Sequence, residues 1–167
     1  DRLTGGDGAD WLEGGGGDDQ IEGGLGDDAL QGGDGQDNLQ GGSGDDTLFG
    51  NDDTAVDWLN GGAGDDVLVL GDGDFATGGA GADLFALGPD LVEDTVAEIL
   101  DFTPGEDSLA LLWDDSAGGE APEITLGDSA LDLMEVYADG ALVGLVHDGS
   151  GLTVADIQLG PMSGMMA

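Results

Sequence analysis

The chain has 167 residues, of which 38 are acidic and one, Arg2, is basic, so its formal net charge is −37. This charge excludes nucleic acid as a partner, because phosphate binding needs clustered lysine and arginine. It also argues against docking on an anionic membrane. The absence of cysteine excludes disulfides and thiolate metal sites. No apolar stretch is long enough to span a bilayer, and no N-terminal signal peptide is visible.

Repulsion between so many carboxylates would ordinarily keep a chain unfolded. Yet 39% of the residues are hydrophobic, and they recur at a regular spacing. We therefore expect the chain to fold only when something cationic neutralises part of its charge. Without cysteine, stability must come from stacking or from a metal bound by oxygen.

A nine-residue repeat organises the first half of the sequence. Five consecutive copies run from Gly5 to Phe49, and two more full copies occupy residues 61–69 and 78–86, with irregular copies at 50–60 and 70–77. Each full copy has glycine at places 1, 2 and 4, aspartate at place 6 and a large apolar residue at place 8. Asp1 to Thr4 fits places 6 to 9 of a further copy, so we expect the sequence to be the C-terminal piece of a longer protein.

This spacing predicts short strands joined by tight turns. The glycines allow positive φ and close approach of the backbone. The three residues around place 8 form a minimal strand, in which the central side chain points to one face and its two neighbours point to the other. The inward side chains would stack as a thin core, comprising Leu12, Ile21, Leu30, Leu39, Leu48, Leu59, Leu68, Ala76 and Phe85. Alternation between two sheets would place Asp10, Asp28, Asp46, Asp66 and Asp83 on one edge, and Asp1, Asp19, Asp37, Asp57 and Asp74 on the other.

The repeat resembles Gly-Gly-x-Gly-x-Asp-x-U-x, the calcium-binding nonapeptide of RTX (repeats-in-toxin) proteins. The resemblance implies an all-β fold, a parallel β-roll of two short-strand sheets in which two repeats complete one coil. It also implies that calcium is shared between turns one coil apart. The implied ligands are the ten place-6 aspartates named above and backbone carbonyls of the turns, for example those of Gly14, Gly16, Gly23, Gly32 and Gly41.

The residue types favour calcium independently of the resemblance. Calcium takes six to eight oxygen ligands at flexible geometry, whereas magnesium demands a strict octahedron and zinc prefers histidine or cysteine. Ten turns would hold roughly six to eight Ca²⁺ ions. The place-5 aspartates are weaker candidates, and we expect them to be solvated turn residues: Asp18, Asp27, Asp45 and Asp65.

After Leu87 the repeat ends, and residues 94–111 predict two strands around the turn at Pro104-Gly105. They also resemble the segment Ile-x-Asp-Phe-x-Pro-Gly-x-Asp-x-Leu that follows the roll in secreted RTX proteins. That resemblance implies that Asp101 and Asp107 help to bind a terminal calcium; surface acids at a turn are the alternative.

Residues 131–147 predict a hairpin around Asp139-Gly140, and residues 152–159 a short strand or helical turn. We therefore divide the chain into a β-roll, residues 1–87, and a C-terminal β-rich capping module, residues 88–167. The outward places of the first sheet become apolar late, as at Val67, so we expect this module to pack over that sheet.

The sequence indicates no catalytic site. His147 is the single histidine, expected at a strand end on the surface, with no serine or cysteine arranged around it. Three tryptophans could stack on sugars, although packing in the core or cap is the expected role: Trp11, Trp58 and Trp113.

The resulting functional hypothesis is a calcium-binding module that folds outside the cell. By resemblance it would leave through a type I secretion apparatus, guided by a C-terminal signal within residues 156–167. It would then be extracellular or surface-bound and would stabilise or display an upstream passenger domain. Two alternatives stay open: a structural or adhesive array with calcium-dependent self-association, and the non-catalytic C-terminal part of a secreted hydrolase or epimerase.

Overall fold

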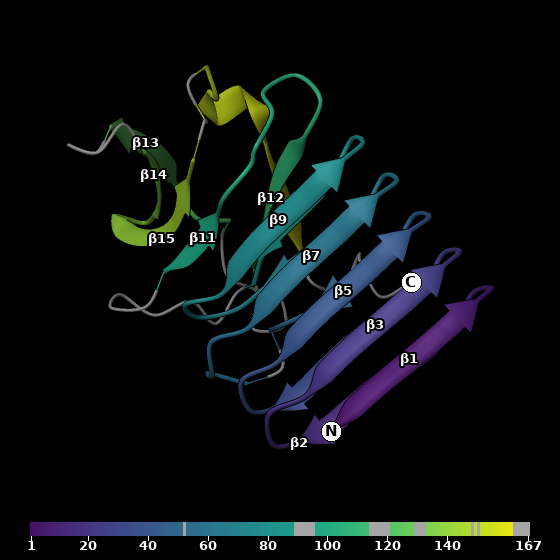
Figure 1. The fold of residues 1–167 in the computed structure, drawn as a ribbon. Coiled ribbons are helices and arrows are strands. Elements are labelled where there is room, and N and C mark those ends of the chain that lie inside the picture. Colours follow the sequence, from purple (N-terminus) through teal and green to yellow (C-terminus); the bar gives the residue numbers. More distant parts are fainter. Residues whose placement is uncertain are drawn as a thin grey trace.

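A computed structural model of the chain describes residues 1–51, 53–88, 96–113, 121–128, 133–147, 149 and 151–161. Within these ranges the chain is built from short β-strands and one turn of 3-10 helix (Figure 1). No helix in them is long and apolar enough to cross a membrane.

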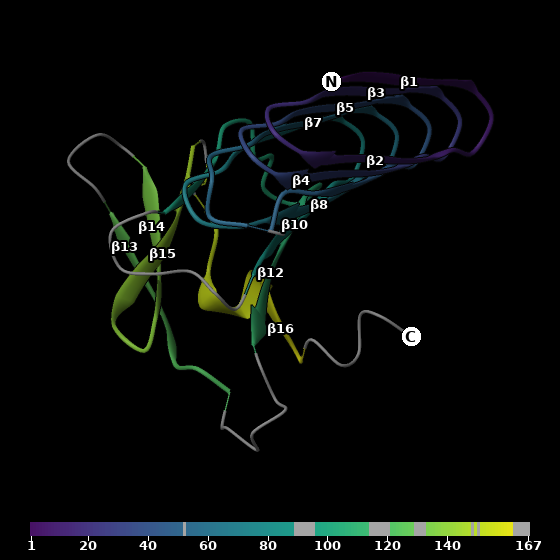
Figure 2. The same ribbon diagram turned by 90° about the horizontal axis from the view of Figure 1, so that it is seen from below.

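The strands of the repeats divide between two parallel sheets that face each other across a flattened coil (Figure 2). Sheet A takes every second strand: β1 (Arg2–Asp7), β3 (Gln20–Leu25), β5 (Asn38–Ser43), β7 (Trp58–Ala63) and β9 (Phe75–Ala80). Sheet B takes the others: β2 (Trp11–Gly16), β4 (Ala29–Asp34), β6 (Thr47–Phe49), β8 (Val67–Leu70) and β10 (Leu84–Leu87). This is the parallel β-roll that the repeat predicts.

The place-8 side chains fill the space between the sheets. Leu39 pairs in register with Ile21 on one side and Leu59 on the other, and all three are at most 2% exposed. Every predicted inward side chain is buried except Leu12, which is partly buried because β2 is the edge strand of sheet B. Since one repeat contributes only one such side chain, burial requires stacking of successive coils.

Both irregular copies keep the alternation between sheets. The long copy at residues 50–60 still delivers Leu59 to sheet A, and the short copy at 70–77 delivers Ala76 to the same sheet. Their length differences are absorbed in the turns, where Gly73 adopts positive φ (79°). The parity predicted from the sequence is therefore confirmed through all nine strands from β2 to β10.

The C-terminal residues extend the roll at its far end. In sheet A, β9 is followed by β11 (Ala97–Ile99), β15 (Ala141–Val146), β14 (Met134–Ala138) and β13 (Ile124–Asp128). In sheet B, β10 is followed by β12 (Ser108–Trp113) and β16 (Ile157–Pro161), which comes after helix η1 (Val154–Asp156). The predicted hairpin is confirmed: β14 and β15 are antiparallel, and Asp139 and Gly140 both have positive φ (51° and 84°).

The described part of the C-terminal segment continues both sheets of the roll. The described C-terminal strands pair with the open edges of both sheets, because the backbone groups of β9 and β10 need hydrogen-bond partners. The outer face of sheet B is apolar from β6 to β12, with Val69, Ala86, Ala110 and Leu112 buried. Val67 is half-buried whereas Gln20, on sheet A, is exposed, as the expected packing over sheet B requires. Residues 162–167 of the predicted secretion signal lie outside the described residues.

Candidate metal sites

The place-6 aspartates form one ladder along each edge of the roll. On the first edge the backbone N–H of Asp10 donates to Oδ1 of Asp28, one coil further on, at 2.8 Å. The same bond links Asp28 to Asp46, Asp46 to Asp66 and Asp66 to Asp83. On the second edge it links Asp19 to Asp37, Asp37 to Asp57 and Asp57 to Asp74. Asp1 begins the second edge, where its carbonyl accepts from the N–H of Gln20 at 3.0 Å. Within each of the two predicted rows, the structure therefore places successive aspartates next to each other.

In six of these carboxylates the second oxygen, Oδ2, has no hydrogen-bond donor among the described residues. The Oδ2 atoms in question are buried and unpaired within the described part of the chain, and belong to Asp10, Asp19, Asp28, Asp46, Asp57 and Asp66. A buried, unpaired carboxylate oxygen carries a large desolvation penalty. Because such oxygens recur along both edges, they mark positions where a bound cation would supply the missing partner.

A backbone carbonyl converges on the same space. A Cβ atom added to Gly5 would lie 2.6 Å from Oδ2 of Asp10 and 2.8 Å from the carbonyl oxygen of Gly23 on the next coil. The arrangement repeats along both edges, with the carbonyls of Gly32, Gly41 and Gly61 beside Asp19, Asp28 and Asp46 respectively. Gly14 lies against Asp19, whereas nothing lies within 4 Å of a Cβ added to Gly16. The carboxylate Oδ2 atoms and the carbonyl oxygens are all hydrogen-bond acceptors, so no hydrogen bond can form between them. A hard cation such as calcium, which binds oxygen ligands, can occupy the space that they share.

Backbone oxygens are needed to complete any such site. Among the described residues, no three side chains of histidine, cysteine, aspartate or glutamate gather in a metal-binding group. Two carboxylates from turns one coil apart therefore leave most of the six to eight oxygen positions of calcium to carbonyls and water.

Burial raises the pKa of the carboxyls in the middle of the roll. Desolvation, opposed by the backbone hydrogen bond and reinforced by neighbouring aspartates, raises the pKa of Asp57 to about 8 and that of Asp66 to about 6. The pKa values of Asp46 and Asp83 are raised from the same causes. The charged forms are therefore disfavoured until an opposite charge is present.

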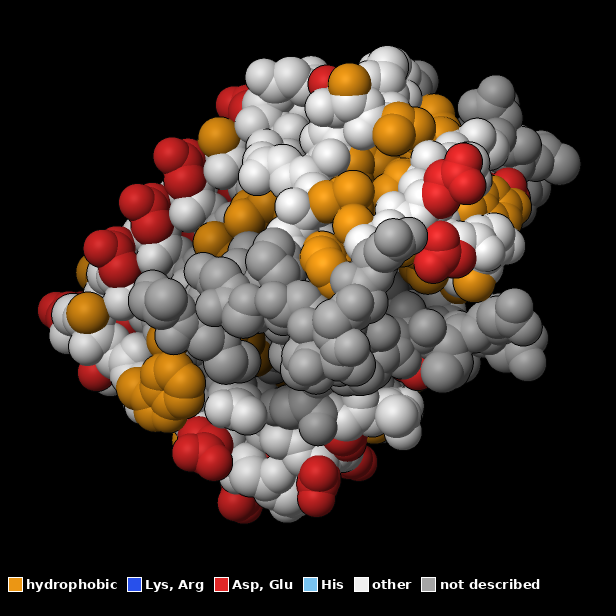
Figure 3. All heavy atoms as spheres, turned by 180° about the vertical axis from the view of Figure 1, so that it is seen from behind, with side chains coloured by type: hydrophobic (Ala, Val, Ile, Leu, Met, Phe, Trp, Pro, Cys, Tyr) orange, Lys and Arg blue, Asp and Glu red, His pale blue; other side chains and the backbone are white. Residues whose placement is uncertain are grey.

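The place-5 aspartates form a second ladder that runs in the opposite direction. Oδ1 of Asp27 accepts from the N–H of Asp45, and Oδ1 of Asp45 accepts from the N–H of Asp65, at 3.0 and 2.9 Å. In the same way, Oδ1 of Asp18 accepts from the N–H of Gln36, and Oδ1 of Asp65 accepts from the N–H of Ala82. The four carboxylates are exposed, as expected, but they also cap the next coil. Their recurrence in one column of the repeat is the signal that could have revealed this role. Figure 3 shows acidic side chains in a row along one edge.

Asp107 continues the first edge beyond the last repeat. Its Oδ1 accepts from the N–H of Asp83 at 3.0 Å, the bond that a place-6 aspartate makes, and its Oδ2 accepts from Thr103 at 2.7 Å. Asp101 lies on the same edge, where its two oxygens accept from the N–H groups of Gly78 and Gly79. The structure therefore brings both predicted residues to the end of this row. Asp53, which the sequence reasoning missed, accepts from Gly35 at 2.7 Å on the second edge.

Comparison with known protein families identifies the repeat that forms these turns. The family model of the RTX calcium-binding nonapeptide repeat matches residues 1–30, 31–54 and 53–74. Residues 1–74 carry RTX calcium-binding repeats. No curated protein sequence matches the chain. Among solved structures, the solution structure of the AlgE6R3 subunit of the Azotobacter vinelandii mannuronan C5-epimerase is similar, with 23% identity, 86% of this chain and 79% of that chain covered, and a TM-score of 0.49.

Repeats of this family bind calcium, and the RTX roll has the groups that calcium requires. Its edges offer unpaired buried Oδ2 atoms next to carbonyls, with no nitrogen or sulfur ligand nearby in the described turns. The ligand set is therefore one that calcium accepts and zinc does not.

The raised pKa values predict an inverted pH dependence for the calcium-free RTX roll. Asp57 and Asp66 bind protons in the folded state up to pKa values of about 8 and about 6, whereas unfolded aspartate releases them near 3.8. Between those values the folded state holds more protons, so stability falls as pH rises. We expect calcium-stripped protein to retain more β-structure at pH 5 than at pH 8, measured by far-UV circular dichroism. Equal or greater β-structure at pH 8 would contradict this prediction.

The remaining candidates are not brought to the metal edges. His147 is half-buried after β15, and its Nε2 lies 3.3 Å from Oε2 of Glu98. The expected packing role is wrong for Trp11 and Trp58, which are 61% and 45% exposed because place 7 faces outward. Trp113 is half-buried at the end of β12.

Proposed function

We propose that the RTX roll binds several calcium ions along its two edges and that this binding drives its folding. The observation that carries the proposal is the repeated pairing of a buried, unpaired Oδ2 with a backbone carbonyl from the next coil. The proposed side-chain ligands are the ten place-6 aspartates, with Asp101 and Asp107 completing the last turn of the first edge. Metal binding and folding are then a single process.

The low affinity of extracellular calcium modules, about 10⁻⁴ to 10⁻³ M, suits a switch between compartments. Cytosolic calcium is far below that range, so the chain would stay unfolded inside the cell and fold outside. On this basis we propose an extracellular or surface module, exported by a type I apparatus, that stabilises or displays a passenger domain. The resemblance of residues 99–109 to the segment that follows the roll in secreted RTX proteins supports this route.

Calcium stoichiometry tests the proposal directly. We expect calcium-stripped protein to bind roughly six to eight Ca²⁺ ions at millimolar concentration. Equilibrium dialysis counts the ions, and the same measurement with magnesium is the control. Binding of fewer than three ions, or equal binding of magnesium, would contradict the proposed sites. Calcium-dependent self-association in sedimentation would instead favour an adhesive or structural array.

Neighbouring aspartates at places 5 and 6 provide a matched test of the ligands. Asp46→Asn removes one charge from a buried place-6 group, and Asp45→Asn removes the same charge from an exposed place-5 group. We expect Asp46→Asn to raise the calcium midpoint of folding about tenfold or more, since ligand-sphere changes cost at least about that much. Asp45→Asn should change it less than about threefold, as for a surface interaction. Equal shifts in the two variants would show that only total charge matters.

A further inference from the structure

Two rows of side chains run across the strands on the outer face of sheet A. The strands are in register, so place 7 of each strand lies beside place 7 of the next, and place 9 beside place 9. The place-7 row contains Gln20, Asn38, Trp58 and Phe75. The place-9 row contains Glu22, Gln40, Asn60 and Thr77. On β5, β7 and β9 these rows carry only amide, hydroxyl and aromatic groups.

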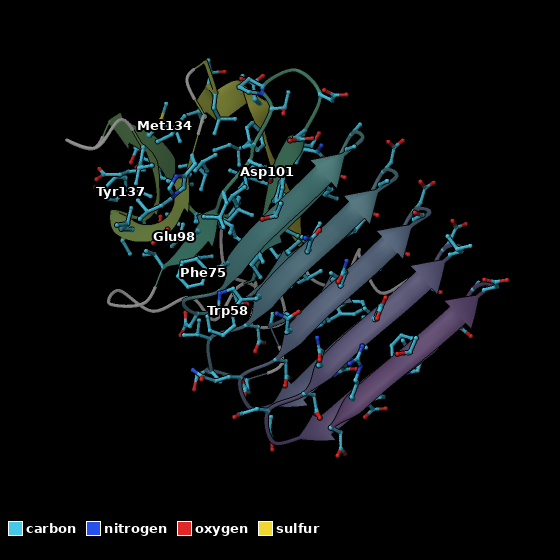
Figure 4. The ribbon with its side chains drawn as sticks, viewed as in Figure 1. Trp58, Phe75, Glu98, Asp101, Met134 and Tyr137 are labelled. Carbon is cyan, nitrogen blue, oxygen red and sulfur yellow. The ribbon has the colours of Figure 1, made fainter. Side chains whose placement is uncertain are left out.

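Trp58 and Phe75 form a stacked aromatic pair in this face. Their ring centroids are 5.9 Å apart and the ring planes are inclined by 12°. They lie side by side at the starts of β7 and β9 (Figure 4). Phe75 covers one side of the indole, yet Trp58 keeps 45% of its surface exposed, with Asn38 as its in-register neighbour on the other side. A large apolar surface is therefore held in a fixed orientation in solvent.

A hollow of about 350 Å³ lies along these two rows. The rings of Trp58 and Phe75 line it together with Asn38, Gln40, Asn60, Thr77 and Leu100. Among the described residues, no hydrogen bond within the chain engages the side-chain amides of Asn38, Gln40 or Asn60. Each amide therefore keeps two N–H donors and an acceptor for a ligand.

The distribution of charge around the hollow limits the kinds of ligand that it can bind. At the margins of the face Arg2 lies 3.8 Å from Glu22 and His147 lies 3.3 Å from Glu98, and the described lining of the hollow is uncharged. The net charge of −37 repels an anionic polymer, and a cation is drawn to the aspartate edges instead. What remains is an uncharged molecule with many hydroxyls and an apolar face.

We propose that this face binds a neutral oligosaccharide. The sugar rings stack against the free side of Trp58, and their hydroxyls pair with the amides of Asn38, Gln40 and Asn60. Such a site has the composition expected of a small-molecule pocket, an apolar platform with a few placed polar groups. It is separate from the metal edges, because places 7 and 9 face outward whereas the place-6 carboxylates lie in the turns.

Isothermal titration calorimetry with cellohexaose and maltohexaose, in millimolar calcium, tests this proposal. At least one of these neutral hexasaccharides should bind the parent protein saturably. Trp58→Ala should weaken that binding about tenfold or more, because it removes the stacking surface. Trp11→Ala is the matched control: it removes an exposed place-7 tryptophan from sheet B and should leave binding unchanged.

Further arms separate the alternatives. Circular dichroism establishes that each variant is folded in calcium; if Trp58→Ala does not fold, the double variant Gln40→Ala/Asn60→Ala replaces it, with the same expected loss. A hexamer of galacturonic acid should not bind. Absence of binding by both neutral hexasaccharides, undiminished binding in the folded variants, or equal binding of the uronate would overturn the proposal. Trp58-dependent dimerisation in sedimentation would overturn it in favour of a second copy of the chain on this face.

Discussion

Removal of calcium is expected to abolish the folded roll. At a free calcium concentration ten times the dissociation constant, each site contributes about 1.4 kcal/mol to the free energy of unfolding, and six sites contribute roughly 8 kcal/mol. Single domains are stable by only about 5–15 kcal/mol in total. Chelation also restores the repulsion between carboxylates that are buried in the turns, such as Asp46, Asp57 and Asp66.

Far-UV circular dichroism and sedimentation velocity during a calcium titration measure this transition. We expect an expanded chain with little β-structure in chelator and a compact β-rich one at millimolar calcium. Sodium chloride at matched ionic strength is the control, because screening alone does not provide ligands for the Oδ2 atoms. A chain that is already compact and β-structured at neutral pH in chelator would refute the coupling of folding to calcium.

Gly33→Ala is expected to destabilise the roll far more than Gly15→Ala, although both glycines occupy place 2 on the same edge. Their φ angles are nearly equal, 102° and 99°, so the strain of a positive φ is common to both variants. A Cβ on Gly33 would lie 2.8 Å from the carbonyl carbon of Gly15 and 3.0 Å from its Cα, whereas a Cβ on Gly15 has nothing within 4 Å. The difference between the variants isolates the close approach of successive coils.

We expect a loss of about 1–2 kcal/mol for Gly15→Ala, the strain of a left-handed residue. For Gly33→Ala we expect roughly 3–5 kcal/mol, because rigid backbone and not a flexible side chain must move. Urea denaturation in saturating calcium measures both. Equal losses would mean that the coils can separate at this turn without cost.

The repeat allowed most of the roll to be predicted from the sequence. A strict spacing places Leu39 inward and Asp37 and Asp57 on one edge, because side-chain direction alternates along a strand and successive strands alternate between sheets. The turn at Asp139-Gly140 was equally predictable, since both residues tolerate positive φ.

Contacts between successive coils were harder to predict from the sequence. The capping of the Asp45 backbone by Asp27, one coil earlier, depends on how turns stack and not on the pattern within one repeat. Asp53 lies in an irregular copy, where no fixed place in the repeat indicates its contact with Gly35. The apolar places of sheet B predicted that its outer face is covered, but they did not predict that β12 would pair with the edge of β10.

The stacking of coils also determines the length of the folded chain along the roll axis. Asp10 and Asp28, for example, are 18 residues apart in the sequence, yet they lie in turns of neighbouring coils. Neighbouring strands are about 4.8 Å apart, whereas 18 extended residues span up to about 60 Å. Along the roll axis the folded chain is therefore more than tenfold shorter than the same chain fully extended. Any segments joined to the two ends of the roll are drawn toward each other as it forms, so the calcium concentration would control their separation.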